Sequence, residues 1–189
     1  DVPESAEGSF EEVEKEISIC KSNSGIQGSR LAAAHMRLGE RLGMVLKSRI
    51  PEQNAALLVL ERGGRFFGDG IYSRFGGTLY PYNPAKEELP VLEHEIVVII
   101  DSVINTGKSI ERIIETLRGR NPKVEIVLVT NVIQRKAVEQ WKDDWLLAVR
   151  VSDNSYVGKN QALQEGNRGP DTADRLFNQL EDMFSCARA

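Results

Sequence analysis

Residues 97–109, VVIIDSVINTGKS, form the stretch of the chain whose residue types are best suited to chemistry. The run VVII predicts a central parallel strand covered on both faces, with Asp101 at its carboxyl end. The turn residues NTG follow, and apolar residues at helical spacing then predict a helix. At such a junction free backbone N–H groups and the positive end of the helix dipole face one point, where the hydroxyls of Thr106 and Ser109 add donors. The stretch therefore predicts a phosphate site for a nucleotide-type ligand.

A Walker P-loop is one interpretation of this stretch, because Gly107, Lys108 and Ser109 reproduce the end of its motif. The first glycine of that motif is replaced by Ser102, at a point where the sharp backbone path tolerates a side chain poorly. The motif also requires a second strand that ends in a metal-binding acid, whereas the next apolar run is expected to end at Thr130. A P-loop nucleotide-binding protein is therefore the less favoured alternative.

The same stretch resembles the diphosphate-sugar signature of type I phosphoribosyltransferases, in which an apolar strand, an acidic pair, an apolar stretch and TG follow one another. The resemblance implies that Asp101 holds the ribose hydroxyls of phosphoribosyl diphosphate (PRPP). Ser102 replaces the second acid of the pair, at a position where the uracil phosphoribosyltransferase branch also lacks an acid, and the resemblance implies that it too contacts PRPP. The remaining PRPP contacts that the resemblance implies come from the loop around the 5′-phosphate: Asn105, Thr106, Gly107, Lys108 and Ser109.

Residues 58–70, LVLERGGRFFGDG, resemble the family's strand and loop that cradle the diphosphate and close with an Asp-Gly pair. In this resemblance Arg62, Gly63 and Gly64 contact the diphosphate, and Arg62 and Asp101 are the catalytic residues. The residue types suit that role, because a guanidinium offers fixed donors to phosphate oxygens and paired glycines let the backbone approach a ligand closely.

Residues 169–177, GPDTADRLF, are similar to the segment that closes on the base in the uracil branch. The base contacts that this similarity implies are Tyr156, Val157, Gly169, Asp171 and Asp174. Each of the three segments also has an ordinary structural interpretation. These are a turn after a strand, a solvated basic turn, and a capped helix N-terminus at Asp171. The ligand-binding interpretation depends on the order of the segments, which is the family's order.

The resemblance implies transfer of ribose 5-phosphate from PRPP to a nucleobase, with uracil favoured, so that UMP and diphosphate form. Mg²⁺ is the implied cofactor, bound through PRPP without a direct side-chain ligand and reached by Asp101 or Asp171 through water. Two departures keep alternatives open. The segment from Gly70 to Asp101 is shorter than the family's covering hairpin, and the link from Tyr156 to Asp171 is longer than in the uracil branch. The alternatives are a noncatalytic regulator that binds a phosphoribosyl ligand, and an interaction module.

Composition narrows the partners to small molecules. The 189-residue chain has a net charge of −4 and no dense basic stripe, which argues against a nucleic-acid polymer. The longest apolar run, residues 96–100, is far shorter than a membrane span, and no secretory signal is visible. Cys20 and Cys186 are isolated, as reduced cytosolic thiols are, and His35 and His94 show no metal-ligand spacing with them. We expect a cytoplasmic protein, and a homodimer is compatible with the resemblance.

Alternating strand and helix patterns predict an α/β fold, a parallel sheet flanked by helices on both faces as in type I phosphoribosyltransferases. The predicted strands are residues 55–60, 77–80, 96–100, 124–130 and 146–151, with a short helix around residues 10–17 and a longer one at residues 30–47. Residues 1–8 are expected to be disordered or trimmed. Residues 1–27 are predicted to form an acidic, partly helical extension, and residues 28–189 a phosphoribosyltransferase-like domain. The site is expected outside the carboxyl ends of the strands, where Arg62, Asp101 and the turn at residues 154–156 converge.

Overall fold

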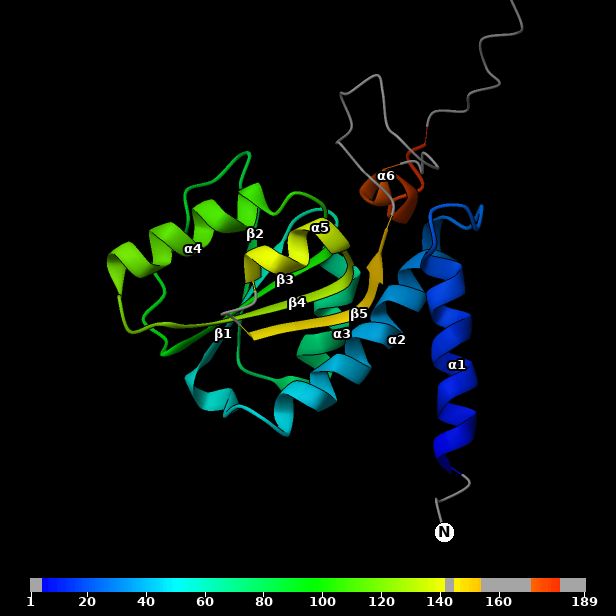
Figure 1. The fold of residues 1–189 in the computed structure, drawn as a ribbon, viewed down its shortest axis with the longest axis horizontal. Coiled ribbons are helices and arrows are strands. Elements are labelled where there is room, and N and C mark those ends of the chain that lie inside the picture. The colour runs from blue at the N-terminus through cyan, green and yellow to red at the C-terminus, as the bar shows by residue number, and fades with distance from the viewer. Residues whose placement is uncertain (1–4, 142–144, 154–170, 181–189) are drawn as a thin grey trace, which may run out of the picture.

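In the computed structural model, residues 5–141, 145–153 and 171–180 are described, with side chains from residue 10 onward. These residues form a five-stranded sheet in which every neighbouring pair of strands is parallel, in the order β2-β1-β3-β4-β5 (Figure 1). The strands are β1 (Ala55–Leu60), β2 (Thr78–Tyr82), β3 (Ile96–Ile104), β4 (Glu125–Gln134) and β5 (Trp145–Ser152). The predicted parallel sheet is confirmed.

Two strands, β3 and β4, each run four residues past their predicted ends, from 100 to 104 and from 130 to 134. β3 continues past Ile100 to Ile104, and β4 continues past Thr130, so Asp101 lies within β3 and not at its end. The prediction ended each strand where polar residues begin. In the sheet these residues stay in register, since Asp101 lies opposite Thr130 and Ile104 opposite Ile133. Backbone pairing therefore extends the strands beyond the apolar runs.

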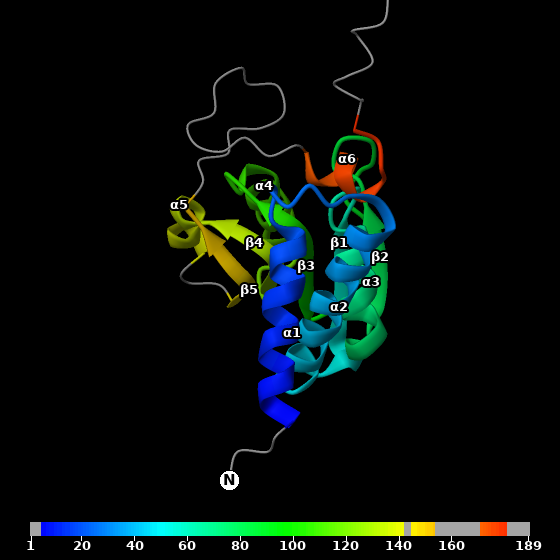
Figure 2. The same cartoon turned by 90° about the vertical axis from the view of Figure 1, so that its right-hand side faces the viewer.

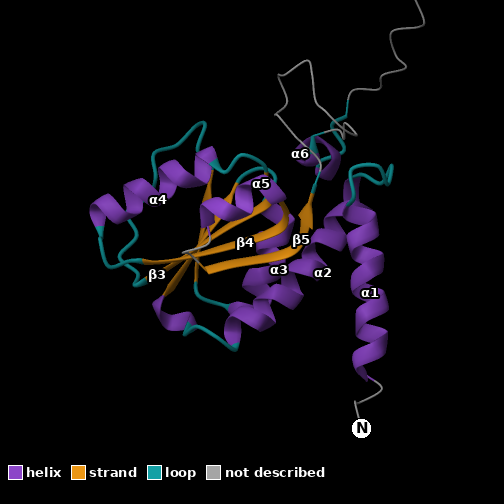
Figure 3. Ribbon diagram, in the orientation of Figure 1, coloured by secondary structure: helices purple, strands orange, loops and turns teal. Residues whose placement is uncertain are grey.

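Helices cover both faces of the sheet, as predicted (Figure 3). The helices are α1 (Ser5–Cys20), α2 (Gly28–Lys47), α3 (Arg65–Phe75), α4 (Lys108–Arg120), α5 (Arg135–Val138) and α6 (Thr172–Leu176), with 3-10 turns η1 (Glu52–Asn54) and η2 (Glu139–Trp141). Successive residues of β1 alternate between the two cores. Leu57 and Val59 pack with α2 and α3, whereas Leu58 and Leu60 pack with α4 and α5. A central strand that is buried on both sides needs this unbroken apolar run.

Glycines allow α2 and α3 to pack closely on one face of the sheet. A Cβ atom at Gly39 would overlap the carbonyl oxygen of Phe67, and one at Gly70 would overlap the carbonyl oxygen of Met36. The two helix backbones are therefore in direct contact, and any larger residue at either position would separate them. This contact fixes α3, whose first turn follows directly after Gly64.

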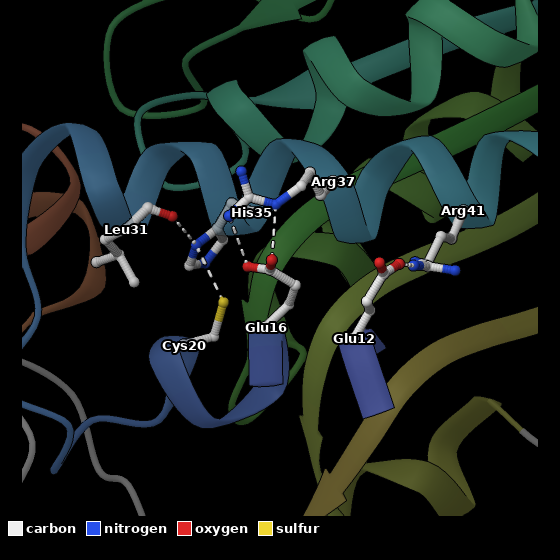
Figure 4. Close-up of polar contacts among 7 residues, drawn as sticks. All are labelled: Glu12, Glu16, Cys20, Leu31, His35, Arg37 and Arg41. Carbon is white, nitrogen blue, oxygen red and sulfur yellow. Dashed lines mark hydrogen bonds and ion pairs between the residues drawn. The ribbon is translucent and has the colours of Figure 1, made fainter. Parts of the chain in front are cut away.

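α1 packs along α2 through two ion pairs, Arg37–Glu16 and Arg41–Glu12, and a buried polar contact (Figure 4). The guanidinium of Arg37 donates to both carboxylate oxygens of Glu16, at 2.7 and 2.9 Å. The Nδ1 atom of buried His35 lies 3.1 Å from the carbonyl oxygen of Leu31 and 3.5 Å from the sulfur of Cys20. Because a carbonyl only accepts, Nδ1 carries the proton, and burial lowers the pKa of His35 to about 4. The contact is therefore between neutral groups.

The expectation that residues 1–8 are disordered is wrong in part, because α1 begins at Ser5. Figures 1 and 2 place α6 beside the turn that joins α1 to α2, at the end of the molecule where the strands β1 and β3 terminate. None of the helices in the described part of the chain is long and apolar enough to cross a membrane.

Candidate active site

The loop between β3 and α4 has the geometry of an anion site. Gly107 adopts a φ of 71° at the N-cap of α4, a left-handed conformation that favours glycine. A Cβ atom there would also lie 2.8 Å from Oε1 of Gln140 and 2.8 Å from Cζ2 of Trp141. Conformation and neighbouring side chains thus both require glycine. The first amides of α4 are left free to face the loop.

A pocket of about 240 Å³ opens on this loop. It is lined by Asp101, Val103, Ile104, Asn105, Thr106, Gly107, Lys108, Ser109 and Ile110. The side chains of Thr106, Lys108 and Ser109 are exposed, so two hydroxyls and an ammonium are available to a ligand. The loop residues predicted to contact the 5′-phosphate are thus brought together with Asp101 around one cavity.

Asp101 is the acid in the wall of this pocket. Burial raises the pKa of its carboxyl from 3.8 to about 7, and the nearby charge of Asp171 adds to the increase. Hydrogen bonds from the backbone N–H groups of Val103 and Ser102 act in the opposite direction. Since these donors cannot offset the desolvation, the carboxyl holds its proton nearly up to neutral pH. A positive charge beside it would favour the ionised form.

Arg62, Gly63 and Gly64 form the turn after β1, which begins with a cis peptide bond between Glu61 and Arg62. A Cβ atom at Gly64 would lie 2.6 Å from the carbonyl oxygen of Leu60 and 3.0 Å from that of Ile100, so the turn passes tightly over β1 and β3. The backbone conformation that brings Arg62 to the carboxyl ends of the strands therefore depends on this glycine.

The turn is shorter than the loop that was predicted to follow the strand and to end at Gly70, because α3 begins at Arg65. The Asp-Gly pair that was expected to close the loop lies inside α3, where Asp69 accepts a hydrogen bond from Arg65 at 3.2 Å. Helical periodicity was not apparent in this stretch because its glycines, Gly68 and Gly70, are poor helix formers. Both positions leave no room for a side chain, because Gly68 lies against Val59 and Gly70 against the backbone of α2.

Ser102 joins the two loops. Its side chain is fully buried, and its hydroxyl donates a hydrogen bond of 2.5 Å to the carbonyl oxygen of Gly63. The position that is usually the second acid of the motif therefore connects β3 to the turn after β1. An acidic side chain here would face a carbonyl oxygen and could donate only when protonated, so serine suits the contact.

Of the predicted base contacts, Asp171 and Asp174 lie in the described part of the chain, whereas Tyr156, Val157 and Gly169 lie outside it. Asp171 caps α6 and accepts a hydrogen bond from the backbone N–H of Asp174 at 3.1 Å. The carboxylate of Asp174 in turn accepts one from Arg62 at 2.6 Å. The capping interpretation is therefore correct for Asp171. Asp174, one turn later, contacts the turn after β1.

Sequence reasoning missed three residues that support the phosphate loop. Gln134, at the end of β4, donates to the side chain of Asn105 at 3.2 Å, and Gln140 and Trp141 lie against Gly107. The indole N–H of buried Trp141 has no hydrogen-bond partner in the described structure. No local motif marks these residues, because they reach the loop only through the pairing of β3 with β4.

The segment between β2 and β3 does not form a covering hairpin. Residues 83–95 contain no strand. Their backbone is hydrogen-bonded to the end of α4, where Arg120 donates to the carbonyl oxygens of Leu89 and Pro90 at 3.0 Å each. His94 also contacts the hydroxyl of Thr78 at 3.2 Å. Residues 83–95 therefore contain no hairpin.

Comparison with known families decides between the P-loop and phosphoribosyltransferase interpretations. The family model for uracil phosphoribosyltransferase matches residues 80–178, just over half of the chain, and includes the phosphate loop and the capped helix α6. The chain belongs to the uracil phosphoribosyltransferase family. The family resemblance inferred from the sequence is confirmed, and a P-loop nucleotide-binding protein is no longer required to explain the loop.

Solved structures show the same fold at low sequence identity. A protein from Aquifex aeolicus is similar over 90% of this chain and 95% of its own, with a TM-score of 0.66 and 16% identity. The xanthine-guanine-hypoxanthine phosphoribosyltransferase of Helicobacter pylori is similar over 61% of this chain and 82% of its own, with a TM-score of 0.50 and 15% identity. No curated protein sequence matches the chain. These structural similarities support the fold, and they leave the base undecided.

The family implies Mg²⁺ together with PRPP, and the residues at the site are compatible with an ion carried by the ligand. No group of three or more His, Cys, Asp or Glu side chains within the described ranges is arranged to hold a metal. Asp101 and Asp171 lie close enough for the charge of one to raise the pKa of the other. Two neighbouring carboxylates fit an ion that is held mainly by diphosphate oxygens and reached through water.

Proposed function

We propose that this protein transfers ribose 5-phosphate from PRPP to uracil and releases diphosphate. The observation that carries the proposal is the pocket in which a phosphate-suited loop at the start of α4 shares its wall with the carboxyl of Asp101. A phosphate bound at the loop would leave the ribose of the same ligand within reach of that carboxyl. A lone phosphate site would not need the acid.

In this proposal the loop from Asn105 to Ser109 holds the nonreacting 5′-phosphate, so that binding energy remote from the reaction orients C1 of the ribose. Asp101 accepts hydrogen bonds from the ribose hydroxyls, and its charge favours the positive charge that develops on the sugar. Arg62 and the amides of Gly63 and Gly64 contact the departing diphosphate. Each group stabilises charge that grows in the transition state.

Mg²⁺ carried by the diphosphate would neutralise leaving-group charge, and Asp101 or Asp171 would hold it through water. Arg62 contributes a positive charge at the same end of the site. The guanidinium is partly exposed and now donates to Asp174. The diphosphate would therefore compete with a carboxylate for the same donors, or share them.

Uracil is the proposed base because the matched family segment extends to residue 178 and includes the Asp171 and Asp174 positions. Uracil presents both donor and acceptor groups on one edge, and polar groups left unpaired by a wrong edge cost about 1–3 kcal/mol each. Cytosine, with a different edge, should be rejected although its size is similar. Purines should be rejected mainly because of their size.

The test is a product analysis by mass spectrometry after incubation with PRPP, Mg²⁺ and uracil, cytosine, hypoxanthine, guanine or adenine in separate reactions. We expect UMP and diphosphate from uracil and little product from the others. A purine nucleotide formed without UMP would reject uracil as the base but keep the transfer reaction. If no base yields a nucleotide, the transferase proposal fails.

A noncatalytic regulator that binds a phosphoribosyl ligand is the second candidate, and the fastened segment of residues 83–95 favours it. This segment is bonded to the end of α4 and contains no strand, so it supplies no covering hairpin of the kind that excludes water from a reacting carbon. Calorimetry with PRPP and Mg²⁺ distinguishes the two functions. Binding without nucleotide formation from any base supports the regulator, and formation of UMP excludes it.

A further inference from the structure

Arg175, on α6, is an arginine buried almost completely, with 1% of its surface exposed. Its Nε and Nη2 atoms donate to the carbonyl oxygen of Ile26 at 3.2 and 2.8 Å. Nη1 donates to the carbonyl of Cys20 at 3.4 Å, and Nη2 also donates to the carbonyl of Lys21 and the hydroxyl of Ser24, each at 3.1 Å. These partners are the last residue of α1 and the turn that joins α1 to α2.

Burying a guanidinium among neutral oxygens is expensive, and the hydrogen bonds offset the cost only in a well-defined geometry. The acceptors include the carbonyl of Cys20 at the C-terminal end of α1, which has no intrahelical donor. Ser24 is oriented by its own bonds, since its hydroxyl donates to the carbonyl of Ile19 at 2.8 Å. The turn is therefore preshaped around Arg175, and the contact is specific for an arginine.

Asp174, the residue before Arg175, contacts a different part of the chain, the turn after β1. Asp174 accepts a hydrogen bond from Arg62 at 2.6 Å, and Gln179 accepts a second at 2.5 Å. The guanidinium of Arg62 lies 5.9 Å from the ring centre of Phe177, which in turn packs against Phe66 at 5.4 Å. α6 is thus fixed on one side to the α1–α2 turn and on the other to the turn after β1.

We propose that Arg175 is a positioning residue for the transfer reaction, which fixes α6 on the α1–α2 turn so that Asp171 and Asp174 are held at the base side of the site. This inference rests on the proposed function, because it assigns the base side of that same site. It makes base recognition depend on the two N-terminal helices, which lie outside the phosphate pocket. Without the Arg175 contacts, α6 is no longer bonded to the α1–α2 turn. The loop between β3 and α4 keeps its contacts with Gln134, Gln140 and Trp141.

The experiment compares Arg175→Met and Arg175→Lys with Arg37→Met as a matched control. Methionine nearly keeps the length of the side chain but removes every donor, and lysine restores a charge and some donors. Arg37→Met removes a half-exposed guanidinium that joins α2 to α1 through two bonds to Glu16, without touching α6. The measurements are the KM for uracil, the Kd for PRPP with Mg²⁺, and the amide hydrogen exchange of residues 20–27 and 171–180.

In Arg175→Met we expect the KM for uracil to rise at least tenfold, the Kd for PRPP to change less than threefold, and amides in both segments to exchange faster. Lysine should restore part of the KM. Arg37→Met should lower the thermal midpoint with the ratio of KM to Kd unchanged. An active Arg175→Met enzyme with the native KM would overturn the inference. Equal losses in KM and Kd would also overturn it, as the signature of general destabilisation. A native protein that forms no nucleotide would instead reject the proposed function.

Discussion

The buried carboxyl of Asp101 lowers the stability of the fold at neutral pH and takes part in the proposed reaction. Its pKa is about 7 in the folded protein and near 3.8 when unfolded, so between these values the unfolded chain releases a proton that the folded protein keeps. The folding free energy therefore becomes less favourable as the pH rises from about 4 to 7, and stays so above 7. Asp101→Asn should remove this loss. Between pH 5 and pH 8 the mutant should gain about 1–2 kcal/mol of stability relative to the native protein. The two pH units from 5 to 7, at about 1.36 kcal/mol each, would give about 2.7 kcal/mol, and relaxation of the protein and nearby water around the buried charge reduces this value.

Urea unfolding at pH 5, 6, 7 and 8 measures this difference. A gap between the two proteins that does not grow with pH would contradict the raised pKa. The same substitution should slow nucleotide formation more than it weakens PRPP binding, because the carboxylate matters most when positive charge grows on the sugar. A mutant that turns over at the native rate would show that Asp101 has only a structural role.

Gly107 sets the shape of the phosphate loop. Gly107→Ala places a Cβ atom at positive φ and against Gln140 and Trp141, so the loop must shift. We expect PRPP affinity to fall at least about tenfold, equivalent to about 1.4 kcal/mol. Gly119→Ala is the control from the same helix, since a Cβ atom at that position would meet no heavy atom within 4 Å. Calorimetric titration that gives equal affinities for the two variants would argue against the loop as the phosphate site.

At the scale of elements, the direct contact of α2 with α3 supports the turn that carries Arg62. Gly70→Ala would force the α3 backbone away from Met36. We expect a loss of about 1–3 kcal/mol, as for other overpacked cores, and a midpoint lower by roughly 2–4 °C for each kcal/mol. In contrast, Gly119→Ala in exposed helix should gain up to about 1 kcal/mol. Differential scanning calorimetry compares them, and a Gly70→Ala midpoint at or above the native value would show that the helices can separate without cost.

At the scale of the whole molecule, ligand binding should stabilise the fold, and the ion should act through the ligand. PRPP at 100 times its Kd should add about 2.7 kcal/mol, which raises the midpoint by roughly 5–10 °C. Mg²⁺ alone should shift the midpoint by less than about 1 °C, because the described residues hold no cluster of metal ligands. Thermal unfolding with PRPP, Mg²⁺, both, and both plus EDTA measures these effects. A large shift with Mg²⁺ alone would indicate a resident metal site.

The sequence by itself determined the strands of the sheet and the loop between β3 and α4. Apolar runs such as VVII must be buried, and TG before a helical pattern must turn, so short-range chemistry located β3, the loop and α4. The same local signals placed Arg62 and Asp171 at the ends of elements. Local signals could not predict where β3 ends, because Asp101 belongs to the strand through its pairing with Thr130 of β4.

The tertiary structure alone decided which polar groups meet. Ser102 bonds Gly63, Gln134 holds Asn105, and Arg175 reaches Ile26 across 149 residues of sequence. It also decided that Asp69 belongs to a helix, since the glycines beside it are explained by contacts with α2 and β1. The physical reason is the same in each case. A side chain's type is local, but its hydrogen-bond partner and its burial depend on segments that only folding brings together.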